Sequence, residues 1–205
     1  MLFRSAGWPS LGQGPGPFDV RLRAARASGR VLMAVNLPWG AATDPRFPEL
    51  AVAILERAAA RGARALKIEK ALGLAVRGPD LERLPVDAPL LDPVWRAAGR
   101  LGLPVVIHTA DPRAFWDPPT PDNERHEELS AHPSWSYYDD PDVPAFEALL
   151  AEQERVIARH PETTFVSVHF GNHAEDPWAV ERWLDRYPNL FVDIAARVVE
   201  LGRHD

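Results

Sequence analysis

Hydrophobic residues gather in five short runs along the chain, and segments with helical spacing of apolar positions lie between them. The runs are continuous rather than alternating with polar residues, which is typical of strands buried on both faces. The five runs cover residues 30–36, 65–70, 103–108, 164–169 and 190–194. Strands that alternate with helices in this way predict βαβ units and a parallel sheet.

The helices between these strands are marked by the residues that begin and end them. Asp92-Pro93 and Asp176-Pro177 each place an aspartate at the cap and a proline at the first helical position. Gly62 follows the apolar-periodic segment 45–61, and Gly102 follows the helix that Asp92-Pro93 begins; glycine commonly ends a helix at such positions. We expect helices over residues 18–28, 45–61, 92–101, 123–129, 144–160 and 176–187, and the start of another in 195–205.

One domain over residues 1–205 accounts for this pattern, with two segments outside it. Residues 1–29 are rich in glycine and proline and are predicted to be irregular, apart from the short helix. Residues 109–143 form a long connection that holds many prolines and aromatic residues. A loop of this length is uncommon in a compact domain unless it is a lid or binding loop, so we expect it to cover the site.

Polar residues near the ends of the predicted strands share one side of the sheet. Side chains alternate along a strand, so Leu66 and Ile68 should face the helices, and Lys67 and Glu69 the opposite side. In 164–169 the same rule sets Val166 and Val168 against His169. The predicted row of inward polar side chains is Asn36, Lys67, Glu69, His108, His169 and Asp193. In a (β/α)8 barrel such strand ends converge on the active site, so the pattern favours a barrel over an open sheet.

Composition narrows the class of protein. The net charge is −6 without a basic block, so nucleic acid is not an expected partner. The chain has no cysteine, which excludes disulfides, thiolate nucleophiles and sulfur ligands for a metal. No apolar run approaches the ~18 residues of a membrane helix, and none near the start reads as a secretory signal. We therefore expect a cytoplasmic protein without a nucleic-acid or membrane partner.

The two strand-end histidines are the candidate metal ligands. Imidazole suits zinc, and His108 and His169 could converge on one ion, which is most simply Zn²⁺. Asp193 or Glu69 could add a carboxylate ligand, or Asp193 could orient a ligand. Lys67 could pair with a substrate carboxylate or with Glu69. A bound ion would make an attached water a nucleophile near neutral pH and polarise a carbonyl.

The remaining basic residues give weaker signals. The chain has 21 arginines, and its two lysines, Lys67 and Lys70, fall in one segment. This is either chance or a site that needs the compact ammonium group. His126, His132 and His173 could reach the site, whereas His160 ends a predicted helix, where a structural role is expected.

Three segments resemble the amidohydrolase-related ("amidohydrolase 2") family of metal-dependent hydrolases. They are residues 102–112, 160–172 and 187–193, and residues 61–67 are similar to the strand that precedes them in that family. The resemblance implies a distorted TIM barrel in which His108 and His169 correspond to the metal-binding histidines of the fifth and sixth strands. It also implies hydrolase or non-oxidative decarboxylase activity, usually with zinc.

The chain also departs from the family pattern. The family begins with a strand that bears an H-x-H pair, but no histidine precedes His108. The family ends with an eighth strand that bears an aspartate, whereas the fifth run here matches the seventh strand. We therefore expect strands three to seven of a barrel that is truncated at both ends, whose open edges favour a homo-oligomer.

The predicted function is a metal-dependent hydrolase that acts on a small carbonyl or carboxylate substrate through a metal-activated water. The alternatives are a non-oxidative decarboxylase of the same family and a catalytically incompetent fragment. Arg113 and Arg197, near strand ends, could join Lys67 in holding a carboxylate under the decarboxylase hypothesis.

Overall fold

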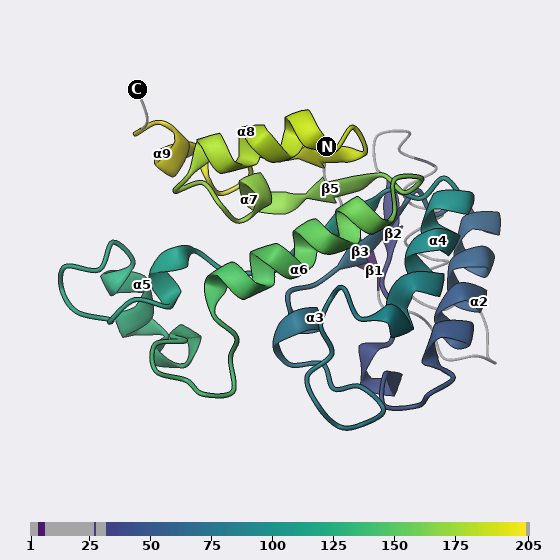
Figure 1. Ribbon diagram of the computed structural model, residues 1–205, viewed down its shortest axis with the longest axis horizontal. Coiled ribbons are helices and arrows are strands. Elements are labelled where there is room, and N and C mark those ends of the chain that lie inside the picture. Colours follow the sequence, from purple (N-terminus) through teal and green to yellow (C-terminus); the bar gives the residue numbers. More distant parts are fainter. Residues whose placement is uncertain (1–3, 7–26, 28–31, 204–205) are drawn as a thin grey trace.

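The computed structural model describes residues 4–6, 27 and 32–203 of the chain (Figure 1). Its described strands form one sheet in which neighbours in sequence are neighbours in space and every pair is parallel. The strands are β1 Arg4–Ala6, β2 Met33–Val35, β3 Ala65–Ile68, β4 Val105–Ile107, β5 Phe165–Ser167 and β6 Leu190–Val192. The predicted parallel sheet is therefore confirmed, and the sheet contains one strand more than the five predicted.

The additional strand, β1, lies in the segment that the sequence predicts to be irregular. Arg4 pairs with Met33 and Ala6 pairs with Val35, at one edge of the sheet. The hydrophobic pattern missed it because Arg-Ser-Ala contains a single apolar residue. The predicted helix over residues 18–28 lies outside the described residues, apart from Ala27, which is helical.

The longer helices follow the predicted positions to within a few residues. Asp176 caps α8 as predicted, because its side chain accepts a hydrogen bond from the Ala179 amide at 3.0 Å. Several short helices in the loops and at the strand ends have no counterpart in the prediction. The α-helices are α2 Phe47–Ala60, α3 Ala71–Leu74, α4 Asp92–Arg100, α5 His126–Ala131, α6 Phe146–Arg159, α7 Val168–Gly171, α8 Pro177–Arg186 and α9 Val198–Leu201. The 3₁₀ turns are η1 Trp39–Ala41, η2 Pro89–Leu91, η3 Arg113–Phe115 and η4 Pro133–Trp135.

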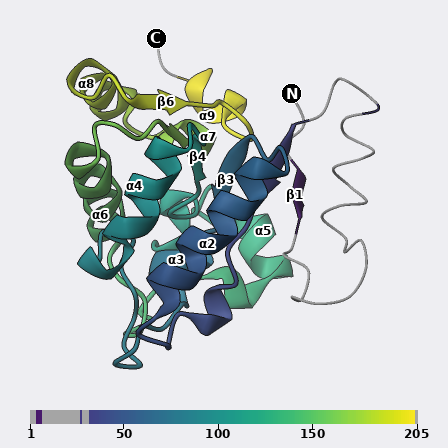
Figure 2. The ribbon, with the colours of Figure 1, turned by 90° about the vertical axis from the view of Figure 1, so that its right-hand side faces the viewer.

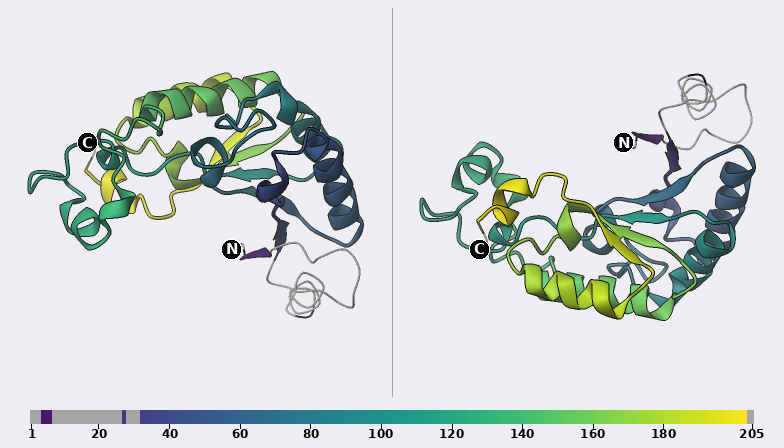
Figure 3. Two further views of the ribbon diagram at one scale, coloured as in Figure 1. Left: turned by 90° about the horizontal axis from the view of Figure 1, so that it is seen from below. Right: turned by 90° about the horizontal axis from the view of Figure 1, so that it is seen from above.

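The sheet is curved, and α2, α4, α6 and α8 follow one another along its outer face (Figures 2 and 3). Sequential parallel strands with their helices on one side are the wall of a (β/α)8 barrel, because a doubly wound sheet would reverse its strand order. Within the described residues β1 and β6 stand at the two edges, so this wall is a partial barrel.

The main core lies between the sheet and these helices. Leu66, Ile68, Val105 and Ile107 are fully buried there, as the alternation along β3 and β4 predicts. The other side of the sheet carries a small separate cluster of Ala34, Ala65, Val106 and Val168. The inward side therefore buries fewer apolar residues than the helix side.

Truncation of Leu66 to alanine should lower the free energy of unfolding by about 2–5 kcal/mol, because it opens a cavity in the core. Leu81→Ala is the matched control, because Leu81 is 70% exposed and its loss should cost less than about 0.5 kcal/mol. Urea unfolding of both variants measures the difference. Equal losses at the two positions would contradict the described packing.

Candidate functional site

His108 and His169 lie side by side at the carboxyl ends of neighbouring strands. Their ring centroids are 4.7 Å apart and the ring planes meet at 78°. His108 directly follows β4, and its amide donates to the Ile68 carbonyl at 3.1 Å, which continues the sheet pairing with β3. The structure thus brings together the two histidines that the sequence singles out.

His169 reaches this position by a left-handed turn and not by strand alternation. Phe165 packs with the helix-side core, and Val166 and Val168 lie with the inward cluster. The prediction that Val166 and Val168 lie on the side opposite to the site is therefore wrong. A regular strand would point His169 at the helices, but His169 has φ 56° and ψ 41°, and Phe170 has φ 57° and ψ 45°. This backbone turns the His169 ring inward.

Such a turn is costly, at about 1 kcal/mol or more for each non-glycine residue, so it needs support from neighbouring groups. Asp193 gives that support from the end of β6. Its Oδ1 accepts from the His169 amide at 2.9 Å, and its carbonyl accepts from the Phe170 amide at 2.6 Å. Asn172, also left-handed, donates from Nδ2 to the Ala110 carbonyl at 2.6 Å and ties the turn to the segment after β4.

The His169 ring is held in the tautomer that leaves Nε2 free to bind a ligand. Its Nδ1 lies 2.7 Å from the Ala195 carbonyl, and a carbonyl can only accept, so Nδ1 carries the proton. An imidazole that donates one N–H to a carbonyl and keeps the other nitrogen free is the usual arrangement of a metal-binding histidine.

Lys67, Glu69 and Asn36 adjoin the histidine pair on the inward side. The Lys67 ammonium donates to the Ile68 carbonyl at 2.7 Å and lies 3.9 Å from Glu69 Oε2. Asn36 Nδ2 donates to Glu69 Oε1 at 3.4 Å. Burial lowers the pKa of Lys67, and the charges of Glu69 and Asp193 oppose that shift.

His108 is neutral at physiological pH. Burial, with smaller contributions from His169 and Lys67, lowers its pKa to about 4. A neutral imidazole offers a lone pair, and the hydrogen bond from His169 Nδ1 leaves its Nε2 free, so both rings present a nitrogen donor to the same space. That donor chemistry fits a divalent ion, and His108 and His169 are the residues that would hold it. Among the described residues, no group of three or more histidine, aspartate or glutamate side chains is placed to hold a metal ion.

The other candidate histidines have contacts of their own. His126 and His132 contact residues of the long loop, since the His126 ring lies 3.3 Å from the Pro119 carbonyl and His132 stacks on Trp135. His173 packs between Phe146 and Trp183, and burial lowers its pKa. His160 is buried against Asp92 at 3.1 Å, which is consistent with the predicted structural role.

Sequence reasoning missed Asp111 and Tyr137 as neighbours of the pair. Asp111 is buried, and its charge is felt by His108. The Lys70 ammonium and the Tyr137 hydroxyl both donate to Asp111 Oδ2, and the bond from Tyr137 is 2.7 Å long. The restriction of lysine to positions 67 and 70 was the one signal that pointed toward this group.

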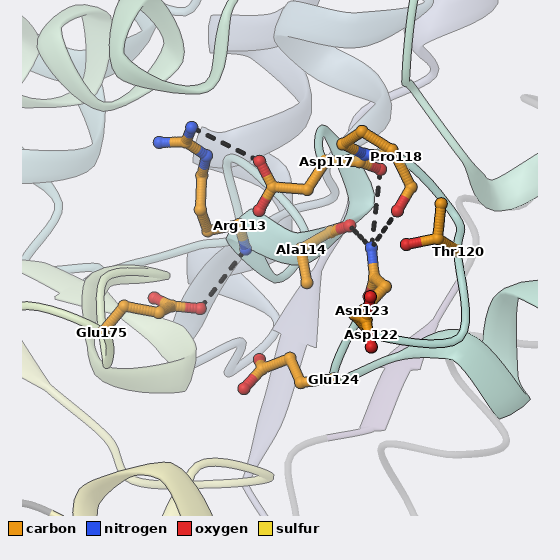
Figure 4. A pocket seen from close by; sticks show the side chains of 9 residues that line it. All are labelled: Arg113, Ala114, Asp117, Pro118, Thr120, Asp122, Asn123, Glu124 and Glu175. Carbon is orange, nitrogen blue, oxygen red and sulfur yellow. Dashed lines mark hydrogen bonds and ion pairs between the residues drawn. The ribbon is translucent and has the colours of Figure 1, made fainter.

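A separate cavity of about 430 Å³ opens between the long loop and the segment after β5 (Figure 4). Asn123 Nδ2 donates to the carbonyls of Ala114 at 2.8 Å and Pro118 at 3.1 Å, which fixes the loop around it. The Arg113 guanidinium lies 3.5 Å from the Asp117 carboxylate, and the backbone amide of Arg113 donates to Glu175 Oε1 at 3.3 Å. None of the predicted metal or catalytic residues lines this cavity. Elsewhere in the described part of the chain, no helix has the length and apolarity needed to cross a membrane.

Comparison with known protein families gives one match, to a family described as amidohydrolase, over residues 20–203. The chain belongs to the amidohydrolase family. The resemblance stated from the sequence is thereby confirmed. A comparison with curated proteins found no match.

Solved structures with this fold include several decarboxylases. A 2,6-dihydroxybenzoate decarboxylase from Rhizobium is 19% identical, with a TM-score of 0.54 over 90% of this chain and 61% of that one. A 5-carboxyvanillate decarboxylase from Sphingomonas paucimobilis is 16% identical, with a TM-score of 0.54 over 91% and 56%. A dihydroxybenzoic acid decarboxylase from a Polaromonas species, with bound manganese and the inhibitor 2-nitroresorcinol, is 16% identical, with a TM-score of 0.55 over 90% and 60%.

These likenesses confirm the TIM-barrel fold class of this amidohydrolase-family chain. The chain spans 61%, 56% and 60% of the lengths of the three structures. The metal and catalytic roles assigned from the sequence to His108, His169, Asp193, Lys67 and Glu69 stay predictions. In the structure, the Asp193 carboxylate accepts a hydrogen bond from the backbone amide of His169.

The neutral His108 makes the stability of the metal-free protein depend on pH. An unfolded histidine has a pKa of 6.5, whereas the folded value is about 4, so between these values the unfolded chain binds the extra proton. The contribution of neutral His108 is fully present above pH ~6.5 and is lost as the pH falls toward 4. With a chelator present, the free energy of unfolding of wild type should fall by about 1–3 kcal/mol more than that of His108→Gln between pH ~6.5 and ~4. Urea unfolding at several pH values measures the loss, and an imidazole NMR titration with a midpoint near 6.5 would contradict it.

Proposed function

We propose that the chain forms part of a divalent-metal-dependent active site that acts on a small carboxylate, and that the reaction is non-oxidative decarboxylation. The observation that carries the proposal is the pair of imidazoles, with ring centroids 4.7 Å apart, at the carboxyl ends of β4 and β5. Catalytic sites of TIM barrels lie at this end of the strands. A bound ion would supply positive charge that orients the substrate and stabilises negative charge developing in the reaction.

The charges around the pair favour an anionic substrate once the ion is present. Counted by formal charge, the lysines 67 and 70 and the acidic residues Glu69, Asp111 and Asp193 together carry one net negative charge. A divalent ion reverses that sign. A partly buried site with net positive charge attracts and concentrates small anions.

Lys67 is better placed than Lys70 to hold the substrate carboxylate. The Lys70 ammonium is already paired with Asp111. The Lys67 ammonium donates to one carbonyl and lies 3.9 Å from Glu69, so it retains donor capacity for a carboxylate. Glu69, with Asn36 on its other oxygen, positions that ammonium, and Asp193 orients His169. Arg113 and Arg197, the other predicted carboxylate partners, bond to Glu147 and Glu200 instead.

Two reactions remain in competition. The solved structures of similar fold named above are decarboxylases, which favours cleavage of the bond between the carboxylate and its ring carbon. Hydrolysis through a metal-activated water is the second candidate, and the amidohydrolase family description favours it. The incompetent-fragment alternative predicts neither activity for this chain. The zinc assignment, the cytoplasmic location and the homo-oligomer also stay predictions.

The chelator-treated 205-residue chain should bind Zn²⁺ or Mn²⁺ with both imidazoles as ligands. The double substitution His108→Ala, His169→Ala should abolish binding in isothermal titration calorimetry, because it removes both nitrogen donors. His132→Ala is the matched control, because the His132 ring stacks on Trp135 in the loop and its removal should leave metal binding unchanged. Binding by the double variant equal to that of wild type would refute the metal site.

The metal-loaded chain should release carbon dioxide from 2,6-dihydroxybenzoate or 5-carboxyvanillate. Lys67→Met should lower kcat/KM about tenfold or more, because it removes a charged hydrogen-bond donor from a buried site. Lys67→Arg should not restore the rate, because the planar guanidinium does not fit a site built for ammonium. Arg96→Met, on the helix side, is the control.

Carbon dioxide release distinguishes the candidates when it is measured beside amide and lactone hydrolysis. Hydrolysis without carbon dioxide would replace the decarboxylase proposal by the hydrolase one. Metal binding with neither activity would support the incompetent fragment.

A further inference from the structure

The long loop between β4 and α6 returns to the strand ends at Tyr137. The Tyr137 hydroxyl donates at 2.7 Å to Oδ2 of Asp111, which lies 26 residues earlier in the chain. The Lys70 ammonium, just after β3, donates to the same oxygen. Asp111 is only 7% exposed. One buried carboxylate oxygen therefore joins the end of β3, the segment after β4 and the far part of the loop.

Tyr137 is held in place by its backbone and ring as well as by its hydroxyl. Its amide donates to the Phe115 carbonyl at 2.8 Å. Its ring lies 4.6 Å from the ring of Trp116, whose indole N–H donates to the Pro144 carbonyl at 2.8 Å. Burial and the Asp111 charge both raise the pKa of Tyr137, so its hydroxyl stays protonated and acts as a donor.

This junction adjoins the histidine pair. Asp111 follows His108 by three residues, and the charges of Asp111 and Lys70 both act on His108. The loop has a second, separate attachment at α5, where Arg125 pairs with Glu200 of α9 and Glu124 pairs with Arg203 at 3.0 Å. Figure 1 shows α5 at the end of the molecule, away from α2 and α4. The Tyr137 attachment ties the far part of the loop to Asp111 and Lys70 beside the strand ends.

We propose that Tyr137 and Lys70 are positioning residues, which act through Asp111 to hold residues 133–143 against the ends of β3 and β4 and so shape the mouth of the site. The anchoring part stands on the contacts alone. The part that concerns the site rests on the proposed function. A hydrogen bond from a neutral hydroxyl to a buried ionised carboxylate is among the stronger ones in a folded protein, so its loss should be measurable.

Tyr137→Phe removes the hydroxyl and keeps the ring that packs on Trp116. Amide hydrogen exchange over residues 133–143 should become about tenfold faster, because local opening no longer breaks this bond. Tyr138→Phe is the matched control, since Tyr138 is 43% exposed and its hydroxyl has no partner among the described residues. Unchanged exchange in Tyr137→Phe, or equal acceleration in both variants, would overturn the anchor.

Lys70 provides an independent test of the same junction. Lys70→Met should accelerate exchange over residues 133–143 because Asp111 then keeps one donor, and Lys70→Arg should largely restore protection by renewing the ion pair. Failure of Lys70→Met to change exchange would remove Lys70 from the proposal.

The role in the site is tested by kinetics or ligand affinity of the metal-loaded chain. Tyr137→Phe should raise KM, or the Kd for 2,6-dihydroxybenzoate, about tenfold with kcat changed less than about twofold. Fast exchange with unchanged KM would show an anchor that does not shape the site. If wild type binds neither metal nor carboxylate, the proposed function fails, and the exchange measurements alone decide the anchor.

Discussion

The left-handed turn at His169 and Phe170 is the feature on which the histidine pair depends. A parallel strand that continued regularly would bury His169 among the helices, where its polar ring would lack a partner. Two consecutive non-glycine residues in this conformation are unfavourable by themselves. Asp193 makes the turn possible because its carboxylate and its carbonyl each accept one of the two amides that the turn exposes. The strand β6 therefore contributes to the site through backbone support.

The overall fold could be predicted because it follows from local patterns. The apolar runs at 65–70 and 103–108 predict strands, and the Asp-Pro pair at 176–177 predicts the start of a helix. The observed elements begin and end within a few residues of these predictions. Alternation then placed Leu66, Ile68 and Lys67 correctly, since β3 is regular to its end. The strand β1 could not be predicted in this way, because its three residues show no apolar pattern. It is recognised only by its pairing with β2 in the folded structure.

The site was predicted in part, and the errors of the prediction have a common physical origin. His108 and His169 were identified as residue types at strand ends, which is a local property. The orientation of His169 depends on Asp193, 24 residues later, and the junction at Asp111 depends on Lys70 and Tyr137, 41 and 26 residues away. Contacts of that separation follow from tertiary structure, so no hydrophobic period or turn signal along the chain records them.

Several energetically unfavourable features occur together around the histidine pair, and they support the proposal that the pair binds a ligand. His108 is held neutral by burial, although a histidine in water near its own pKa is partly charged. Lys67 is a cation in a setting that disfavours its charge, and His169 has a strained backbone. A structure selected for stability alone would avoid these costs, because an apolar residue at each position would fill the inward side of the sheet. A positively charged ligand between the two imidazoles would use both lone pairs, and a carboxylate beside it would compensate Lys67. Under the proposed function, these two ligands would account both for the residue types and for the coincidence of strain and desolvation at the ends of β3, β4 and β5.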